Sequence, residues 1–341
     1  GPTGAFIVII YGVVAEFGLT GLMLATIMAG LFLVLLGVFR LGTIIKFIPY
    51  PIVVGFTSGI AVTIFTTQVK DLFALQMDAV PAEFVEKWIA YGKNFLTLDP
   101  ATTIVGILSI IIIALTPRFS KKVPGSLVAI ILATVAVYFL NMFEITKIET
   151  IGDRFGEIKA ALPEITALSI FEGGVTWSMI NTLIPTAITI AVLGAIESLL
   201  SATVADGVTG HHHDSNQELV GQGIANIVTP FFGGIPATGA IARTMTNINN
   251  GGRTCISGII HALVLLVIFI LLMPLASYIP MSCLAGVLVV VSYNMSGWRT
   301  FRELMSNPKS DVSVLIITFL LTVIFDLTVA IEVGLIIACL L

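Results

Sequence analysis

One carboxylate of this sequence lies within a long apolar stretch, a position that indicates a chemical role. Glu197 lies in the apolar segment 178–204, and Ser201 follows one helical turn later on the same face. A carboxylate inside a membrane is costly, so it is by default a functional-site hypothesis. A protonated Glu197 can carry a proton, whereas an ionised one needs a cation such as Na⁺ beside it. The structural alternative is a protonated glutamate that hydrogen-bonds a neighbouring helix.

Two short apolar segments form an internal repeat. The first opens with the residues PTGA at 2–5, and the second opens with PATGA at 236–240. Downstream of each comes an Ile-Pro pair, with a glycine six residues after the proline, at Gly55 and at Gly286. Short, glycine- or proline-interrupted apolar segments at matching positions of two halves point to the substrate site of a secondary transporter. The alternative is that small residues at these positions only let helices pack closely.

Such segments predict an anion site. A helix that begins inside the membrane leaves its first N–H groups unpaired and exposes the positive end of its dipole. Two such ends facing each other attract an anion without a buried lysine. We expect Gly4 and Gly239 to let the anion approach the backbone, and the hydroxyls of Thr3 and Thr238 to add hydrogen bonds. Arg243 either adds positive potential to this site or extends to the membrane interface.

Residues for covalent or metal chemistry are sparse. His211–His213 are consecutive, and adjacent side chains do not converge on one ion, so we expect a solvated loop rather than a metal site. Cys255, Cys283 and Cys339 lack the spacing of metal ligands. The apolar segments hold no nucleophile–base pair, so the sequence does not indicate an enzyme, and we expect no cofactor.

The composition indicates the elements that must position these groups. Of 341 residues, 57% are hydrophobic and 11% are charged, against about 25% charged in soluble domains. Long apolar runs without alternation predict transmembrane helices rather than a barrel, and roughly ten to twelve spans fit the length. A net charge of −4 without a basic cluster argues against nucleic acid as a partner. We expect an all-α polytopic membrane protein in a lipid bilayer. Its predicted apolar segments lie near 3–15, 19–39, 51–69, 101–117, 124–143, 178–204, 218–232, 238–248, 255–277, 280–296, 311–326 and 328–341.

The connecting segments predict the orientation. If loops alternate sides, ten lysine and arginine residues fall in short loops on one side, and six fall on the other side in two long acidic connections, 70–100 and 144–177. The positive-inside rule makes the first side, and with it the C-terminus, cytoplasmic. The long connections are expected to be surface excursions with short amphipathic helices.

Six motifs occur in order along nearly the whole chain: GPTGAF (1–6), GFTSGI (55–60), LGAIESLL (193–200), ELVGQG (218–223), FGGIPATGAIART (232–244) and NNGGRT (249–254). Together they resemble the SulP family of anion transporters. The family resemblance implies fourteen spans in two inverted seven-span repeats, like those of uracil permease, with a core and a gate domain and often a homodimer. Residues 1–143 then form spans three to seven, 144–177 an extracytoplasmic connection, and 178–341 spans eight to fourteen. Spans one and two are expected ahead of Gly1, and a cytoplasmic STAS domain after Leu341.

The resemblance also implies which residues form the site. Glu197 and Ser201 match positions that hold Na⁺ in a sodium-coupled bicarbonate member, together with backbone at Gly239. That member has aspartate and threonine there, and the glutamate form is more similar to bacterial proton-coupled dicarboxylate members. By the same resemblance, the anion lies between the half-helices of spans three and ten, at Thr3, Gly4, Ala5 and Phe6 and at Thr238, Gly239, Ala240, Ile241 and Arg243.

The sequence therefore predicts a secondary active transporter of sulfate, dicarboxylate or bicarbonate in the cell (inner) membrane. The expected mechanism is alternating access coupled to H⁺. The alternatives are a Na⁺-coupled bicarbonate symporter and an uncoupled exchanger or channel of the same fold. The identity of the anion stays open.

Overall fold

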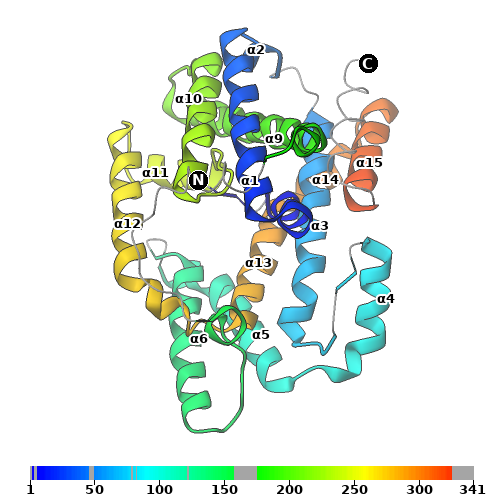
Figure 1. Ribbon diagram of the computed structural model, residues 1–341, viewed down its shortest axis with the longest axis vertical. Coiled ribbons are helices and arrows are strands. Elements are labelled where there is room, and N and C mark those ends of the chain that lie inside the picture. Colours follow the sequence, from blue (N-terminus) through cyan, green and yellow to red (C-terminus); the bar gives the residue numbers. More distant parts are fainter. Residues whose placement is uncertain are drawn as a thin grey trace.

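A computed structural model describes residues 2–3, 6–45, 50–77, 80–81, 83–120, 123–156 and 175–324, and helices dominate this part of the chain (Figure 1). Across these ranges no strand is formed, apart from an isolated bridge between Thr150 and Pro280. The expected all-α class is confirmed. The helices are α1 (Ile7–Val38), α2 (Gly42–Ile45), α3 (Tyr50–Phe73), α4 (Phe84–Asn94), α5 (Pro100–Phe119), α6 (Gly125–Met142), α7 (Ile151–Phe155), α9 (Trp177–Thr209), α10 (Ser215–Val228), α11 (Ile241–Asn249), α12 (Ile256–Ala276), α13 (Met281–Met295), α14 (Trp298–Leu304) and α15 (Lys309–Ile324), with 3-10 turns η2 (Phe95–Thr97) and η3 (Thr229–Phe232).

Seven helical stretches in the described residues are long and apolar enough to cross a membrane. They show a multi-pass membrane protein. Further predicted spans correspond to α10, which has 14 residues and is short for a crossing of about 20, and to α15, of which the structure describes the part up to Ile324. The predicted segment 328–341 lies outside the described residues. The seven stretches are Ile9–Val38, Tyr50–Phe73, Pro100–Phe119, Gly125–Met142, Trp177–Thr209, Ile256–Ala276 and Met281–Leu304.

Two helical pieces are too short to span the bilayer, as the sequence predicts. Gly18 interrupts α1 with φ of 66° and ψ of −167°, a conformation that glycine adopts without a Cβ clash. The piece 7–17 before it is therefore only about 16 Å long. The second short piece is α11, with nine residues and a length of about 14 Å. The hydrocarbon core is about 30 Å thick, so each piece is a half-helix.

The helices pack in two groups. In one, α1 packs against α9 and α10, and α11 packs against α9; in the other, α3 packs against α13 and α15, and α5 packs against α6 and α13. The glycines of the sequence repeat lie at matching contacts in the second group. A Cβ on Gly55 of α3 would lie 2.6 Å from the carbonyl oxygen of Leu315 in α15, and one on Gly286 of α13 would lie 2.8 Å from that of Gly106 in α5. Both glycines let two helix backbones touch.

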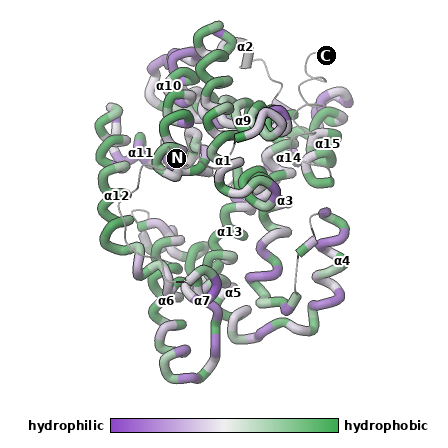
Figure 2. Tube along the Cα trace, viewed as in Figure 1, coloured by the Kyte–Doolittle hydropathy of each residue, from purple (hydrophilic) through white to green (hydrophobic). Residues whose placement is uncertain are grey.

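Apolar side chains lie both inside and outside the bundle. The largest buried cluster joins α1, α3 and α9 through Leu33, Ile60 and Leu193. In contrast, α12 exposes large apolar residues on all sides, with Leu263 57% and Leu271 68% exposed. Figure 2 shows α12 as a nearly continuous apolar helix at the edge of the molecule. Such a surface suits lipid rather than water.

The long connections carry the short helices expected for them. In the first connection, α4 exposes Val85 and Ile89 while Tyr91 on another face is 2% exposed. In the second, α7 begins with a capping box in which Thr150 and Asp153 bond each other's main-chain N–H groups. Residues 157–174 of this connection lie outside the described part of the chain.

The start of the second connection is tied to the turn between α12 and α13. The ties are main-chain hydrogen bonds next to the bridge at Thr150 and Pro280. We call residues 149–152 the strap. Its bonds run from the N–H groups of Ile151, Gly152 and Met281 to the carbonyl oxygens of Ile279, Ser277 and Glu149, at 2.9, 2.8 and 3.0 Å.

One arginine adds side-chain contacts to the strap. The guanidinium of Arg154 bonds Glu149 with two nitrogens, and one of them also lies 2.9 Å from a carboxylate oxygen of Asp71, near the end of α3. The side chains of Arg154 and Asp71 are 29% and 21% exposed. This network joins the strap to the second packing group.

Candidate functional site

Glu197 and Thr3 meet although 194 residues separate them. The hydroxyl of Thr3 donates to Oε2 of Glu197 at 3.0 Å. Glu197 belongs to α9, and Thr3 precedes the half-helix at the start of α1. The internal repeat singled out Thr3, and the carboxylate in an apolar segment singled out Glu197. These two residues are therefore neighbours.

The second half-helix approaches the same region of α9. Thr238 is 1% exposed, and its hydroxyl donates to the carbonyl oxygen of Gly194 at 2.9 Å. The N–H of Gly239 donates to Oγ of Ser198 at 3.0 Å. A Cβ on Gly239 would lie 3.0 Å from Cα of Ser198, so the missing side chain permits this approach. Because Gly194, Glu197, Ser198 and Ser201 share one helical face, both short segments lie against that face.

The main-chain N–H groups at the start of α11 lack side-chain caps. Ala240 is the N-cap residue, with φ of −141° and ψ of 117°, and its side chain makes no capping bond. The next three N–H groups, from Ile241 onward, have no acceptor within their own helix. They carry the positive end of the α11 dipole. This arrangement can bind an anion.

The first half-helix begins in a similar way. Phe6 is the N-cap of α1, without a side-chain capping bond, and its N–H donates to the carbonyl oxygen of Thr3 at 3.2 Å. The Phe6 ring is 1% exposed and faces Gly194, where an added Cβ would lie 3.7 Å from Cζ of the ring. The predicted binding residues Gly4 and Ala5 lie outside the described residues.

Arg243 makes a contact that neither sequence interpretation includes. Its side chain is on α11, and NH2 donates to the carbonyl oxygen of Pro2 at 2.9 Å. Pro2 directly precedes Thr3, so Arg243 links the two half-helix segments. Its guanidinium brings positive charge to the side of the site where the first segment begins.

The side chain of Ser201 bonds α11 and does not bond Glu197. Its side-chain oxygen lies 2.8 Å from that of Thr244 in α11, and Ser201 is 4% exposed. Ser201 and Glu197 share a face of α9, as predicted. The oxygens near them, from carboxylate, hydroxyl and carbonyl groups, are ligands that suit a hard cation.

Sequence reasoning missed Asn226 of α10. Its side chain is 1% exposed and bonds both main-chain groups of Ala237, the residue just before Thr238. Gln222, one turn earlier, bonds the same carbonyl and accepts from Ser198. An asparagine four residues after Gln222 on one helical face was the available signal.

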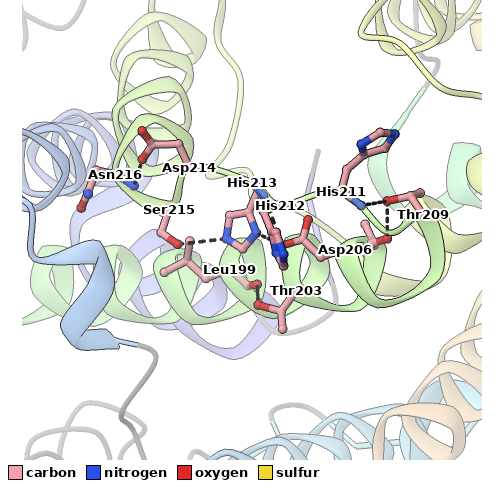
Figure 3. A network of polar contacts seen from close by, with 11 residues as sticks. Leu199, Thr203, Asp206, Thr209, His211, His212, His213, Asp214, Ser215 and Asn216 are labelled. Carbon is pink, nitrogen blue, oxygen red and sulfur yellow. Dashed lines mark hydrogen bonds and ion pairs between the residues drawn. The ribbon is translucent and has the colours of Figure 1, made fainter.

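The histidine run divides into two parts, which Figure 3 shows. His211 and His212 are exposed, as expected for a solvated loop. His213 is not, because Nδ1 lies 2.7 Å from Oδ2 of Asp206 and Nε2 lies 3.0 Å from Oγ of Ser215. His213 thus joins the end of α9 to the start of α10. Among the described residues, no group of three or more histidine, cysteine or acidic side chains could hold a metal ion.

Comparisons with known proteins agree with this architecture. The model of the sulfate permease family matches residues 1–318. The chain is 42% identical to the "Putative sulfate transporter YvdB" of Bacillus subtilis, over 99% of this chain and 62% of that protein. It is 32% identical to the bicarbonate transporter BicA of Picosynechococcus, over 99% of this chain and 59% of that protein. The chain therefore spans about three fifths of the length of these curated relatives, whose names describe transporters and not enzymes.

Solved structures share the fold. The transmembrane domain of a cyanobacterial BicA superposes with a TM-score of 0.82 at 32% identity, over 99% of this chain and 82% of that chain. The murine anion transporter Slc26a9 in its inward-facing state superposes with a TM-score of 0.81 at 19% identity, over 95% of this chain and 52% of that chain. The second likeness concerns the fold alone.

Proposed function

Since the chain belongs to the sulfate permease family, we propose that it forms the membrane part of a secondary active anion transporter. The observation that carries the proposal is the meeting of two half-helix segments on one face of α9. Thr3 bonds Glu197, and Gly239 bonds the adjacent Ser198. Sulfate, dicarboxylates and bicarbonate are the proposed substrate class.

In this proposal the anion binds at the uncapped first turn of α11. The hydroxyl of Thr238 and the N–H of Gly239 already donate to α9, so their role is to position the segment. The N–H groups of Ala240, Ile241 and the residue after it supply the hydrogen bonds to the anion. Phe6 and the predicted residues Gly4 and Ala5 form the opposite side. Arg243 adds positive charge at the edge of the site.

Glu197 is the proposed coupling residue. Binding an anion in a site of low dielectric constant is favoured when a proton or a cation enters with it. Glu197 accepts a hydrogen bond from Thr3, so a change in its charge acts directly on the segment that faces the anion. We assign H⁺ as the coupled ion. The second candidate is Na⁺ coupled to bicarbonate, with Ser201 and the backbone at Gly239 as further ligands. The similarity to BicA, which is named as a bicarbonate transporter, favours the anion of this candidate.

The packing supports an alternating-access mechanism with two repeats. Gly55 of the first half, 1–143, contacts α15 of the second half, and Gly286 of the second half, 178–341, contacts α5 of the first half. Two related halves are expected to make such reciprocal contacts. We propose that α1, α9, α10, α11 and α12 form the core domain, and that α3, α5, α6, α13 and α15 form the gate. A cell membrane location with a cytoplasmic C-terminus, and a homodimer, complete the proposal.

Transport by the full-length protein in proteoliposomes tests the proposal. Labelled sulfate, bicarbonate and fumarate are offered separately, and pH and Na⁺ gradients are imposed independently. We expect saturable uptake of at least one anion, accelerated by an inward proton gradient alone. Acceleration only by Na⁺ supports the second candidate. Uptake that responds to neither gradient contradicts coupling, and no saturable uptake of any of the three anions contradicts the proposed function.

A further inference from the structure

The carboxamide of Asn226 bonds both main-chain groups of Ala237, which lies shortly before α11. Its Nδ2 donates to the carbonyl oxygen of Ala237 at 2.8 Å, and its Oδ1 accepts from the N–H of Ala237 at 2.9 Å. The second Nδ2 hydrogen goes to the carbonyl oxygen of Gln222 at 2.9 Å. Asn226 is 1% exposed. Both donors of the amide are thus used in a buried place, where an unmade hydrogen bond is expensive.

Three consecutive residues before α11 are fixed in this way from two helices. Asn226 and Gln222 of α10 bond Ala237, while α9 bonds Thr238 through Gly194 and Gly239 through Ser198. Ser198 also donates to Gln222 at 3.3 Å, so the two sets are joined. We call the contacts of Asn226 and Gln222 with Ala237 the α10 clamp.

The helix that follows cannot fix its own direction. α11 has nine residues, and helices shorter than about 12 residues are marginal on their own. Its first turn has no side-chain cap. The direction in which its N–H groups point is therefore set by bonds to other helices. Thr244 of α11 bonds Ser201, α9 bonds Thr238 and Gly239, and the α10 clamp holds Ala237.

We infer that Asn226 is a positioning residue of the anion site, which it serves by holding Ala237 without touching the anion. This inference rests on the proposed function. Its consequence is that Asn226 governs the affinity for the anion more than the rate of the conformational cycle. Loss of the clamp lets the first turn of α11 change direction, and hydrogen bonds to an anion weaken steeply with angle.

A second asparagine supplies a matched control. Asn141 of α6 makes the same pair of bonds to Ile148, with Nδ2 donating to its carbonyl oxygen at 2.9 Å and Oδ1 accepting from its N–H at 3.0 Å. Ile148 directly precedes the strap and lies away from α9, α10 and α11. Asn226→Leu and Asn141→Leu therefore remove the same type of contact, without adding charge, at the site and away from it.

The test measures anion uptake by the full-length protein and its two variants in proteoliposomes, at several concentrations of sulfate and bicarbonate. Thermal unfolding of each purified protein is recorded in parallel. We expect Asn226→Leu to raise the half-saturation concentration about tenfold, which corresponds to about 1.4 kcal/mol and to the loss of one buried hydrogen-bonded contact. Maximal uptake per folded protein stays unchanged. Asn141→Leu lowers the unfolding temperature and leaves half-saturation at the wild-type value.

The outcomes are distinct. Equal half-saturation in Asn226→Leu and wild type, or an equal rise in both variants, overturns the inference and leaves the proposed function standing. A wild-type protein without saturable uptake of either anion overturns both. If Asn226→Leu does not fold, Gln222→Met decides, because from a partly exposed position it removes one donor to Ala237 together with the 3.3 Å bond that Gln222 accepts from Ser198. A smaller rise in half-saturation supports the inference, and an unchanged value overturns it.

Discussion

A single methyl group added at Gly239 should weaken anion binding measurably. In Gly239→Ala the new Cβ would lie 3.0 Å from Cα of Ser198, whereas carbon atoms prefer about 3.5 to 4.0 Å. The segment must therefore move away from α9 by at least about 0.5 Å. That movement stretches the 3.0 Å bond between Gly239 N–H and Ser198 to the limit of a hydrogen bond. Overpacking costs about 1 to 3 kcal/mol, and we expect a rise in half-saturation of about five- to a hundredfold if that free energy acts on the site.

The assay compares this variant with Gly207→Ala in the same helix bundle. Nothing lies within 4 Å of a Cβ added at Gly207, which belongs to α9. An alanine there is expected to stabilise the helix slightly, since alanine has the higher helix propensity. Uptake kinetics and thermal unfolding are measured for both proteins. The reasoning is refuted if Gly239→Ala transports with the same half-saturation and unfolds at the same temperature as Gly207→Ala.

Three further predictions concern separate parts of the molecule. Glu197→Gln should fold normally but lose the acceleration of uptake by a proton or sodium gradient; a variant that keeps this dependence removes the coupling role. Arg154→Gln should lower stability by about 1 kcal/mol, because its ion pair with Asp71 is only partly buried, and the difference from wild type should shrink in high salt; equal melting curves at low salt would contradict this. Hydrogen bonds from the side chain and N–H of Thr150 hold the pKa of Asp153 below its ordinary value. The capping box therefore contributes fully above the ordinary carboxyl pKa of about 3.9 and is lost as pH falls through the lower folded value. NMR titration should show the Asp153 pKa rising in Thr150→Ala, and an unchanged pKa would rule out this cause.

Much of the helical framework follows from the sequence alone. Within the predicted segments 3–15 and 238–248 the structure forms short helical pieces, 7–17 and Ile241–Asn249, each shorter than the hydrocarbon core is thick. Gly18 breaks α1 at the boundary expected between its two segments. The sequence also singles out Thr3 through the repeat and Glu197 through its charge in an apolar segment, but it does not predict their contact.

The detailed hydrogen bonding of the site is not accessible in this way. The hydroxyl of Thr238 turns to a carbonyl of α9, and Arg243 reaches Pro2. Such choices depend on which main-chain group lies within reach after the helices have packed, and no spacing rule encodes that distance. Asn226 was missed for the same reason, because its spacing from Gln222 places both side chains on one helical face but does not show which main-chain groups that face meets.

His213 illustrates the opposite error. Three consecutive histidines give a sequence pattern typical of a solvated loop, and two of them are exposed. The third is held by Asp206 and Ser215, which come from the two flanking helices. The geometry of the turn therefore buries His213 in part and leaves His211 and His212 exposed, although the sequence pattern treats the three histidines as equivalent.

The main-chain nature of the strap determines which substitutions it can tolerate. Its bonds use N–H and C=O groups, which every residue except proline supplies in full. Side chains at Ile151 and Met281 can therefore diverge widely while the connection persists, whereas a Cβ added at Gly152 would lie 3.0 Å from the carbonyl oxygen of Ser277. Proline is the exception at Ile151, Gly152 and Met281, because it lacks the hydrogen that each position donates. Variation at Ile151 and Met281 is limited only by the exclusion of proline, and variation at Gly152 is limited also by the close approach of Ser277.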